Sequence, residues 1–407
     1  MNKQLFLLLI GRIMTNLADS LYMIATIWYV KEVTASPFLI GLTSAIAMLP
    51  VTIQFLYGPI IDRFPKRKIL FIAEAGQGVL LAIISILYFA ETLWLPLLFV
   101  FMFMALSLAE ATYPTENALI QRLAGKESLT KVNSIFAFSY QTLDIILDAI
   151  SGILILFLGI GIIYASNSLL LLAIGFMFLL FLKVPSTNKE RSSLTEKFFV
   201  QYKEDFVEGY QVVRKQTTLL AVLFGIIVIN VMATMGLAML PVISDNPAEY
   251  GFWLTAMSIG TLCGTVISSR LDRFLLRGIF PIASALAGLA WIGAFLFYGK
   301  APLIICMVLF GVSWVAVGIL SIYVQTIIQV NLPEDHVGSG FAFLSSLLGS
   351  LSPLGYMIGG LLGEWSGAEI VLMIAGSGYL VFTIYFLIHP TLKNLNNRIN
   401  EPFQLHN

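Results

Sequence analysis

The chain has 407 residues, of which 58% are hydrophobic and 11% are charged, and its formal net charge is zero. A typical soluble domain has about 25% charged residues, so this composition excludes a soluble protein with a large core and indicates an integral membrane protein. The sequence has no CxxC, HExxH, GxSxG or Walker-type motif and no basic tract. We therefore expect no enzyme, no cofactor, no metal site and no nucleic-acid partner.

Apolar segments of about 20 residues, which is enough to cross a bilayer, recur along the whole chain. We expect an all-α membrane protein of twelve transmembrane helices in two pseudo-symmetric six-helix bundles, residues 1–182 and 217–390. A polar stretch, residues 183–216, is the one long connection and predicts a cytoplasmic linker with an amphipathic helix, and residues 391–407 form a cytoplasmic tail. The predicted spans are 5–30, 38–60, 69–89, 94–118, 133–157, 160–182, 217–243, 251–270, 278–298, 302–328, 340–363 and 368–388.

The basic residues indicate the orientation of these spans. Of the 23 lysines and arginines, all except Arg12, Lys31 and Lys300 lie in segments that face the cytoplasm if the N-terminus does. Cytoplasmic loops of membrane proteins carry an excess of Lys and Arg. The sequence therefore predicts a multi-pass protein of the cell membrane, with both termini in the cytoplasm and an even number of spans.

Two short matches relate the two halves of the chain. Asp62-Arg63-Phe64 follows the second predicted span, and Asp272-Arg273-Phe274 follows the eighth; Phe136-Ala137-Phe138 begins the fifth, and Phe341-Ala342-Phe343 begins the eleventh. Parallel repeats about an axis along the membrane normal are a transporter architecture, with a substrate site near the midplane. We therefore expect alternating access to a small molecule by a monomer in the bilayer.

Four carboxylates, Asp19, Glu110, Asp144 and Asp148, interrupt apolar helices of the first half. A charged side chain at the centre of a membrane helix costs about 2.5–3.5 kcal/mol on insertion scales, so these acids predict a proton or cation pathway. Helical spacing places polar residues on one face of each helix: Arg12, Asn16 and Asp19; Ser107, Glu110, Pro114, Asn117 and Gln121; and Gln141, Asp144 and Asp148.

Two groups are the leading candidates for proton coupling. Asp144 and Asp148 lie one helical turn apart, and two like charges in a poorly solvated place favour holding a proton. Asp19 lies near the middle of the first helix. Arg12 lies about 10 Å from Asp19 along the axis, so we expect Arg12 to pair with an acid on another helix. The alternative role of each acid is a structural hydrogen-bond acceptor.

The second half has uncharged polar residues in its spans, and Asn230, Thr234, Trp314 and Gln325 are the candidates for lining a cavity. Such residues also serve ordinary helix packing. An acidic first half would handle protons and cationic groups, and a neutral, aromatic second half would hold apolar surface.

One loop carries a resemblance to the major facilitator superfamily. The family's pattern between helices 2 and 3, Gly-x-x-x-Asp-Arg-x-Gly-Arg-Arg, resembles Gly58-Pro59-Ile60-Ile61-Asp62-Arg63-Phe64-Pro65-Lys66-Arg67-Lys68, in which Pro65 replaces the second glycine. Further stretches resemble the macrolide-efflux and siderophore-exporter branch of proton-coupled drug antiporters: Gly11-Arg12 with Asp19, Thr34-Ala35-Ser36-Pro37, Leu332-Pro333-Glu334-Asp335, and Pro353-Leu354-Gly355 with Gly359-Gly360.

The resemblance implies a gating motif that latches the two halves. In the family, the acid corresponding to Asp62 lies against the start of helix 11, where unpaired amides favour a carboxylate. The cation corresponding to Lys66 pairs with an acid at the end of helix 4, a place that Glu116 fits. Gly58, Arg63 and Arg67 complete the motif. The alternative is that these cations only set the topology.

The chain departs from the family's pattern at helices 4 and 5. Asp148 stands where the branch has small residues or proline, and helix 4 has Glu110 and Glu116 where many drug antiporters have an arginine. The leading hypothesis is proton-driven efflux of lipophilic, cationic or amphiphilic drugs, and so antibiotic resistance. The alternatives are export of a siderophore or other metabolite, and, remotely, a non-transporting receptor or an intramembrane enzyme.

Overall fold

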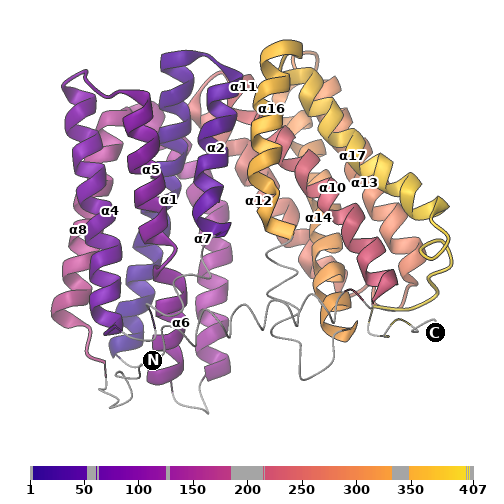
Figure 1. The fold of residues 1–407 in the computed structure, drawn as a ribbon, viewed down its shortest axis with the longest axis horizontal. Coiled ribbons are helices and arrows are strands. Elements are labelled where there is room, and N and C mark those ends of the chain that lie inside the picture. Colours follow the sequence, from indigo (N-terminus) through magenta and orange to yellow (C-terminus); the bar gives the residue numbers. More distant parts are fainter. Residues whose placement is uncertain are drawn as a thin grey trace. The chain divides into compact units, whose positions relative to one another are not determined.

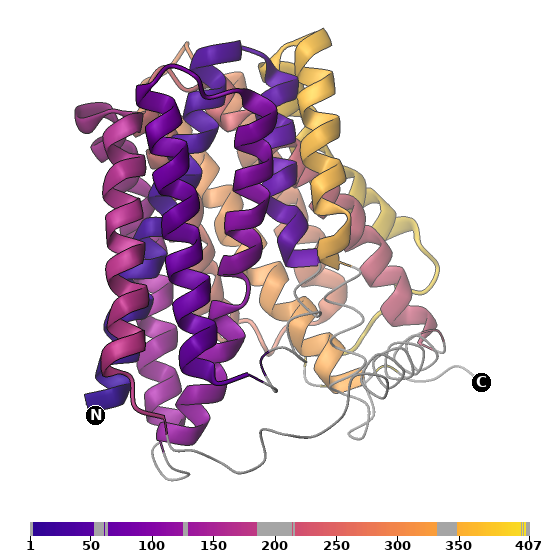
Figure 2. The same cartoon turned by 60° about the vertical axis from the view of Figure 1, so that its left-hand side comes forward.

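The computed structural model describes residues 3–52, 61, 64–124, 129–184, 214, 216–331, 348–399, 401 and 403, and only the backbone of some residues in 121–149. The described chain is helical (Figure 1, Figure 2). The helices are α1 (Lys3–Thr34), α2 (Pro37–Thr52), α4 (Lys66–Phe89), α5 (Leu95–Ala109), α6 (Thr112–Leu123), α7 (Leu129–Leu158), α8 (Ile160–Phe181), α10 (Thr217–Leu237), α11 (Leu240–Ile243), α12 (Pro247–Ser268), α13 (Leu276–Leu296), α14 (Leu303–Asn331), α16 (Ser352–Ser366) and α17 (Ala368–Ile388).

These helices form the twelve-span fold that the sequence predicts. In the described part of the chain, nine helical segments are long and apolar enough to cross a membrane, and two of them, Leu95–Ile120 and Thr217–Ile243, each combine two of the helices above. Two shorter apolar stretches, Pro37–Thr52 and Ile146–Leu158, coincide with the second and fifth predicted spans. The predicted linker lies almost entirely outside the described residues.

The chain divides into two compact units. Unit 1 comprises residues 1–35, 46–195 and 244–255, and unit 2 comprises residues 36–45, 196–243 and 256–407. The helices α1, α4, α5, α6, α7 and α8 belong to unit 1, and α10, α13, α14, α16 and α17 belong to unit 2.

The two units repeat one packing pattern. In unit 1, α1 packs on α7 and α8, and α4 packs on α5 and α8. In unit 2, α10 packs on α16 and α17, and α13 packs on α14 and α17. These are the same pairs of helices counted from the start of each half, which is the repeat that the matched tripeptides suggest.

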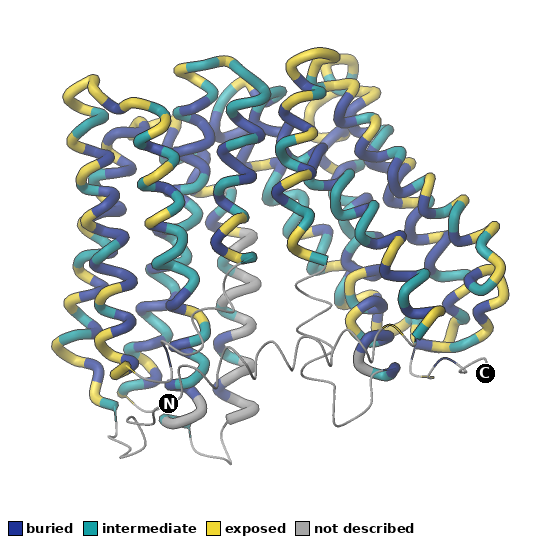
Figure 3. The backbone as a smooth tube through the Cα atoms, viewed as in Figure 1, coloured by how far each residue is buried: buried dark blue, intermediate teal, exposed yellow. Residues whose placement is uncertain are grey.

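Burial follows helical periodicity within each unit (Figure 3). On α4 the buried positions include Leu70, Ala73, Glu74, Gln77 and Leu81, which lie three or four residues apart and therefore share a face. The opposite face of α4 exposes apolar side chains such as Ile72 and Ile86, as expected of a surface that meets lipid.

The fourth predicted span is not one regular helix. The helix α5 ends at Ala109, and α6 begins at Thr112. Pro114 explains the position of this interruption, because proline has no N–H and its ring clashes with the carbonyl of the residue four positions earlier, here Glu110. The amide of Ala111 instead bonds the carbonyl of Leu108, three residues back. A single polar face running from Ser107 to Gln121 is therefore not maintained.

A close helix crossing attaches the start of α12 to unit 1. A Cβ placed on Gly251 would lie 2.4 Å from the carbonyl oxygen of Asp148, and one on Gly152 would lie 2.3 Å from the carbonyl oxygen of Pro247. Only glycine allows backbones to come this close. Lys31 of α1 also donates to the carbonyl of Ser244, just before α12.

The start of α2 is attached to unit 2 in a similar way. A Cβ on Gly41 would lie 2.5 Å from the carbonyl oxygen of Tyr356 on α16. The carboxylate of Glu364 accepts hydrogen bonds from the Ser36 hydroxyl at 2.9 Å and from the Phe38 amide at 3.2 Å. A carboxylate at a helix N-terminus satisfies the unpaired amides of the first turn.

The C-terminal segment, predicted to be a tail, packs on unit 2. Leu392, Leu395 and Phe403 are buried, and the amides of Leu276 and Arg277 donate to carbonyls of this segment. Its backbone thus supplies acceptors to the first turn of α13, a role that hydropathy alone does not reveal.

Candidate functional site

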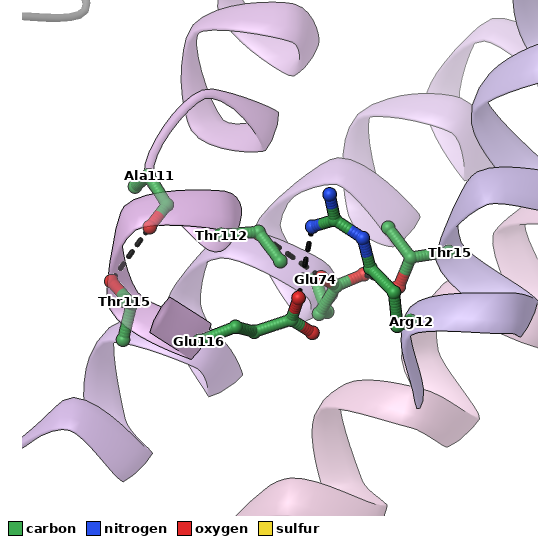
Figure 4. Close-up of polar contacts among 7 residues, drawn as sticks. All are labelled: Arg12, Thr15, Glu74, Ala111, Thr112, Thr115 and Glu116. Carbon is green, nitrogen blue, oxygen red and sulfur yellow. Dashed lines mark hydrogen bonds and ion pairs between the residues drawn. The ribbon is translucent and has the colours of Figure 1, made fainter. Parts of the chain in front are cut away.

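A cluster of buried charged and hydroxyl side chains lies where α1, α4 and α6 meet in unit 1 (Figure 4). Its ion pair joins Arg12 Nη1 to Glu116 Oε2 at 2.9 Å, and the two side chains are 9% and 2% exposed. The Arg12 guanidinium also lies 4.5 Å from the centre of the Tyr113 ring, a cation–π distance. Arg12 therefore has its acid partner on another helix, as the sequence predicts.

Glu74 is the second buried carboxylate of this cluster. Its Oε2 accepts a hydrogen bond from the Thr15 hydroxyl on α1, and its Oε1 accepts one from the Thr112 hydroxyl on α6, both at 3.1 Å. Glu74 is fully buried. It therefore connects three helices through two neutral hydroxyl groups.

Asp19 lies one turn beyond Thr15 on the same face of α1. It interacts electrostatically with Arg12, Glu74, Glu110 and Glu116. The interior of unit 1 thus brings four carboxylates near one another, and Arg12 is paired with Glu116 and interacts with Asp19. Such intramembrane groups line ion and proton pathways in membrane proteins.

Asp148 occupies a separate place. The Ser20 hydroxyl lies 3.5 Å from Asp148 Oδ1 and 3.1 Å from the Ser151 hydroxyl, so this carboxylate faces α1 one position beyond Asp19. The side chains of Gln141 and Asp144 lie outside the description, and the predicted Asp144–Asp148 pair stays a prediction. Two amides from other predicted polar faces, Asn16 of α1 and Asn117 of α6, are partly buried.

The structure corrects the predicted partner of Glu116. The resemblance assigns Glu116 to Lys66, but the carboxylate is bound by Arg12. Lys66 begins α4 and is buried, whereas Arg67 beside it is exposed. The arginine is the better partner because its guanidinium is a more weakly hydrated cation for a buried pair. Gly58, Asp62 and Arg63 lie outside the described residues.

Unit 2 contains a cavity of about 440 Å³ between α10, α14, α17 and the start of α16. Its polar lining includes Asn230, Thr234, Trp314 and Gln325, the four residues that the sequence singles out, and no charged side chain is among the described residues that line it. The Trp314 Nε1 group has no hydrogen-bond partner among the described residues. This cavity offers apolar and aromatic surface with a few neutral hydrogen-bonding groups, as small-molecule sites do.

The sequence reasoning missed Glu74 and its two threonines. The nearness of Glu74 in the sequence to the basic residues at the start of the third predicted span favours a place at the membrane boundary, where a carboxylate needs no function. The signal that identifies it is its setting, Ala73-Glu74-Ala75-Gly76-Gln77-Gly78, because small residues on a membrane helix mark a face packed closely on another helix. No group of three or more potential metal ligands occurs among the residues that the structure describes.

The chain has the fold of solved transporters. The solved structure of the nucleoside transporter NupG superposes with a TM-score of 0.69 at 13% identity, covering 94% of this chain and 98% of that one. The family model described as transmembrane secretion effector matches residues 1–404, and the chain belongs to that family.

Two relatives illustrate the family. The uncharacterized MFS-type transporter YfiS of Bacillus subtilis is 25% identical over 402 residues, 95% of this chain and 93% of YfiS. Macrolide efflux protein A of Streptococcus pyogenes is 21% identical over 389 residues, 90% of this chain and 91% of the relative. The chain is thus a multi-pass membrane transporter of small molecules and not an enzyme.

Proposed function

We propose that the protein exports lipophilic, cationic or amphiphilic compounds in exchange for protons. The observation that carries this proposal is the group of acids Asp19, Glu74, Glu110 and Glu116 in unit 1, of which Glu116 is paired with the buried cation Arg12. A group of acids with one buried cation stays close to neutral only by binding protons, because unpaired buried charge is costly. Proton exchange with the two sides of the membrane is the chemistry such a group supports.

The cavity of unit 2 supports the substrate class. Its lining is apolar and aromatic with neutral polar groups, which favours an uncharged, lipophilic part of a substrate. The similarity to macrolide efflux protein A supports outward transport of bulky lipophilic compounds. A strongly anionic metabolite is less suited, because Arg12 is already paired.

The proposal includes location and assembly. The distribution of basic residues supports a place in the cell membrane with both termini in the cytoplasm. Each half of the chain supplies its own packed unit, and a monomer suffices for alternating access between two such halves.

Transport in reconstituted vesicles tests the function. Ethidium, a lipophilic cation, and erythromycin, a macrolide, serve as probes under an imposed pH difference, and a catecholate siderophore tests the alternative. We expect the pH difference to drive ethidium or erythromycin, and Asp19→Asn and Asp148→Asn to lose driven transport. If both variants keep it, these two acids do not couple transport to protons. Driven transport of the siderophore alone would favour the metabolite exporter.

A further inference from the structure

Glu74 differs from Glu116 in what binds its carboxylate. Glu116 is held by a permanent cation, Arg12, whereas both oxygens of Glu74 accept hydrogen bonds from neutral hydroxyls, those of Thr15 and Thr112 (Figure 4). Neutral hydroxyls adapt to either protonation state, because each can donate to a carboxylate or accept from a carboxylic acid. The two buried glutamates are therefore suited to different tasks.

The charged side chains near Glu74 come from α1 and α6, the helices whose threonines bond it. The helix α1 supplies Arg12 and Asp19, and α6 supplies Glu116, which Arg12 neutralises. The helices α5 and α8 contain no charged residue in their sequences. Among the described residues, the ion pair of this cluster is that of Arg12 with Glu116, whereas Glu74 is bound by hydroxyl groups.

Glu74 also bonds the start of α6, which follows an interruption of the membrane helix. Thr112 is the first residue of α6, directly after the interruption at Glu110 and Ala111. Two contacts hold the start of α6 to its neighbours: Thr112 to Glu74, and Glu116 to Arg12. Interrupted membrane helices commonly border transport sites. Both contacts involve a carboxyl group, but only Glu116 has a permanent cation bound to it, and that cation favours its ionised form.

We propose that Glu74 binds and releases a transported proton and that this proton controls the contact between α4 and α6. When Glu74 is ionised, both threonine hydroxyls donate to it. When it gains a proton, its own O–H must donate, so one of the two hydrogen bonds reverses and the affected threonine needs another acceptor. This assignment rests on the proposed function and adds to it the residue at which protons couple to helix movement.

The test uses purified protein in vesicles with ethidium as the probe. Two rates are measured: exchange of ethidium without a pH difference, and its accumulation driven by one. We expect Glu74→Gln to retain exchange, because glutamine keeps the shape and hydrogen bonds with both threonines, and to lose driven accumulation. Glu91→Gln, the same change at an exposed position, should retain both activities.

The outcomes separate the two proposals. If the wild-type protein shows no pH-driven ethidium transport, the proposed function fails, and the role of Glu74 fails with it. If the wild type is driven and Glu74→Gln is driven equally, the role of Glu74 alone is refuted.

Infrared difference spectra decide the case in which Glu74→Gln loses both activities. When the spectrum of the alkaline wild-type sample is subtracted from that of the acidic one, the C=O band of a protonated carboxyl group should appear. A Thr15→Val/Thr112→Val variant keeps the carboxyl group of Glu74 but lacks the two hydroxyls that bond it, so the same band should appear at a different frequency. An unchanged band in this variant overturns the assignment.

Discussion

The ion pair between Arg12 and Glu116 gives a prediction with a calculable size. Both side chains are nearly inaccessible, at 9% and 2% exposure, so removing one partner leaves a buried charge uncompensated. We expect Glu116→Leu to lower the free energy of unfolding by about 3–5 kcal/mol. Replacing both partners, Arg12→Met with Glu116→Leu, removes both desolvation costs and should leave stability near the wild-type value.

Unfolding by sodium dodecyl sulfate in mixed micelles measures these free energies. Cys306 is buried and Cys263 is exposed, so a Cys263→Ser background leaves one thiol that becomes reactive only on unfolding. Pulse labelling of Cys306 at each detergent ratio then reports the unfolded fraction. A loss of unfolding free energy below about 1 kcal/mol in Glu116→Leu would refute the buried pair. So would a double variant whose loss equals the sum of the losses measured for Arg12→Met alone and Glu116→Leu alone.

Three further predictions concern packing and the cavity. Gly251→Val brings a side chain against the carbonyl of Asp148 and should cost about 1–3 kcal/mol in the same unfolding assay, whereas Gly278→Ala, which meets open space, should be neutral or stabilising. Asn331→Ala removes the acceptor for the Phe403 amide at 2.6 Å and should cost about 1–3 kcal/mol. Trp314→Phe keeps the ring but removes the N–H, and the transport KM for erythromycin should rise about two- to tenfold.

Distinct results would contradict each of these predictions. Equal stability of Gly251→Val and Gly278→Ala would show that the α7–α12 crossing tolerates separation. An Asn331→Ala variant as stable as the wild type would show that the C-terminal segment does not depend on this contact. An unchanged KM for Trp314→Phe would remove Trp314 from the substrate's hydrogen-bonding partners.

The spans were predictable because membrane insertion depends on local composition. A run of about 20 apolar residues must form a helix, since its backbone has no other hydrogen-bond partners in lipid. The positions of α13 and α17 follow from this reasoning to within a few residues. Pro114 even contains the information for the break in the fourth span, because its missing N–H acts on the adjacent turn.

The contacts of the candidate site were less predictable because they join distant parts of the chain. Glu74 meets Thr15 and Thr112, which are 59 and 38 positions away, and helical periodicity shows only which residues share a face of one helix. Periodicity indicated that Arg12 needs a partner elsewhere, but it could not choose Glu116 over the other acids. The choice depends on how α1 and α6 pack, which no single helix encodes.

Simultaneous measurement of proton and substrate movement tests the central claim most directly. Vesicles containing the protein and an internal pH-sensitive dye are prepared with an acidic interior, and ethidium is added outside. We predict that ethidium enters as protons leave, so that its addition dissipates the pH difference only when the protein is present. Ethidium entry without accelerated proton loss, or entry of protons together with ethidium, would contradict proton-coupled export.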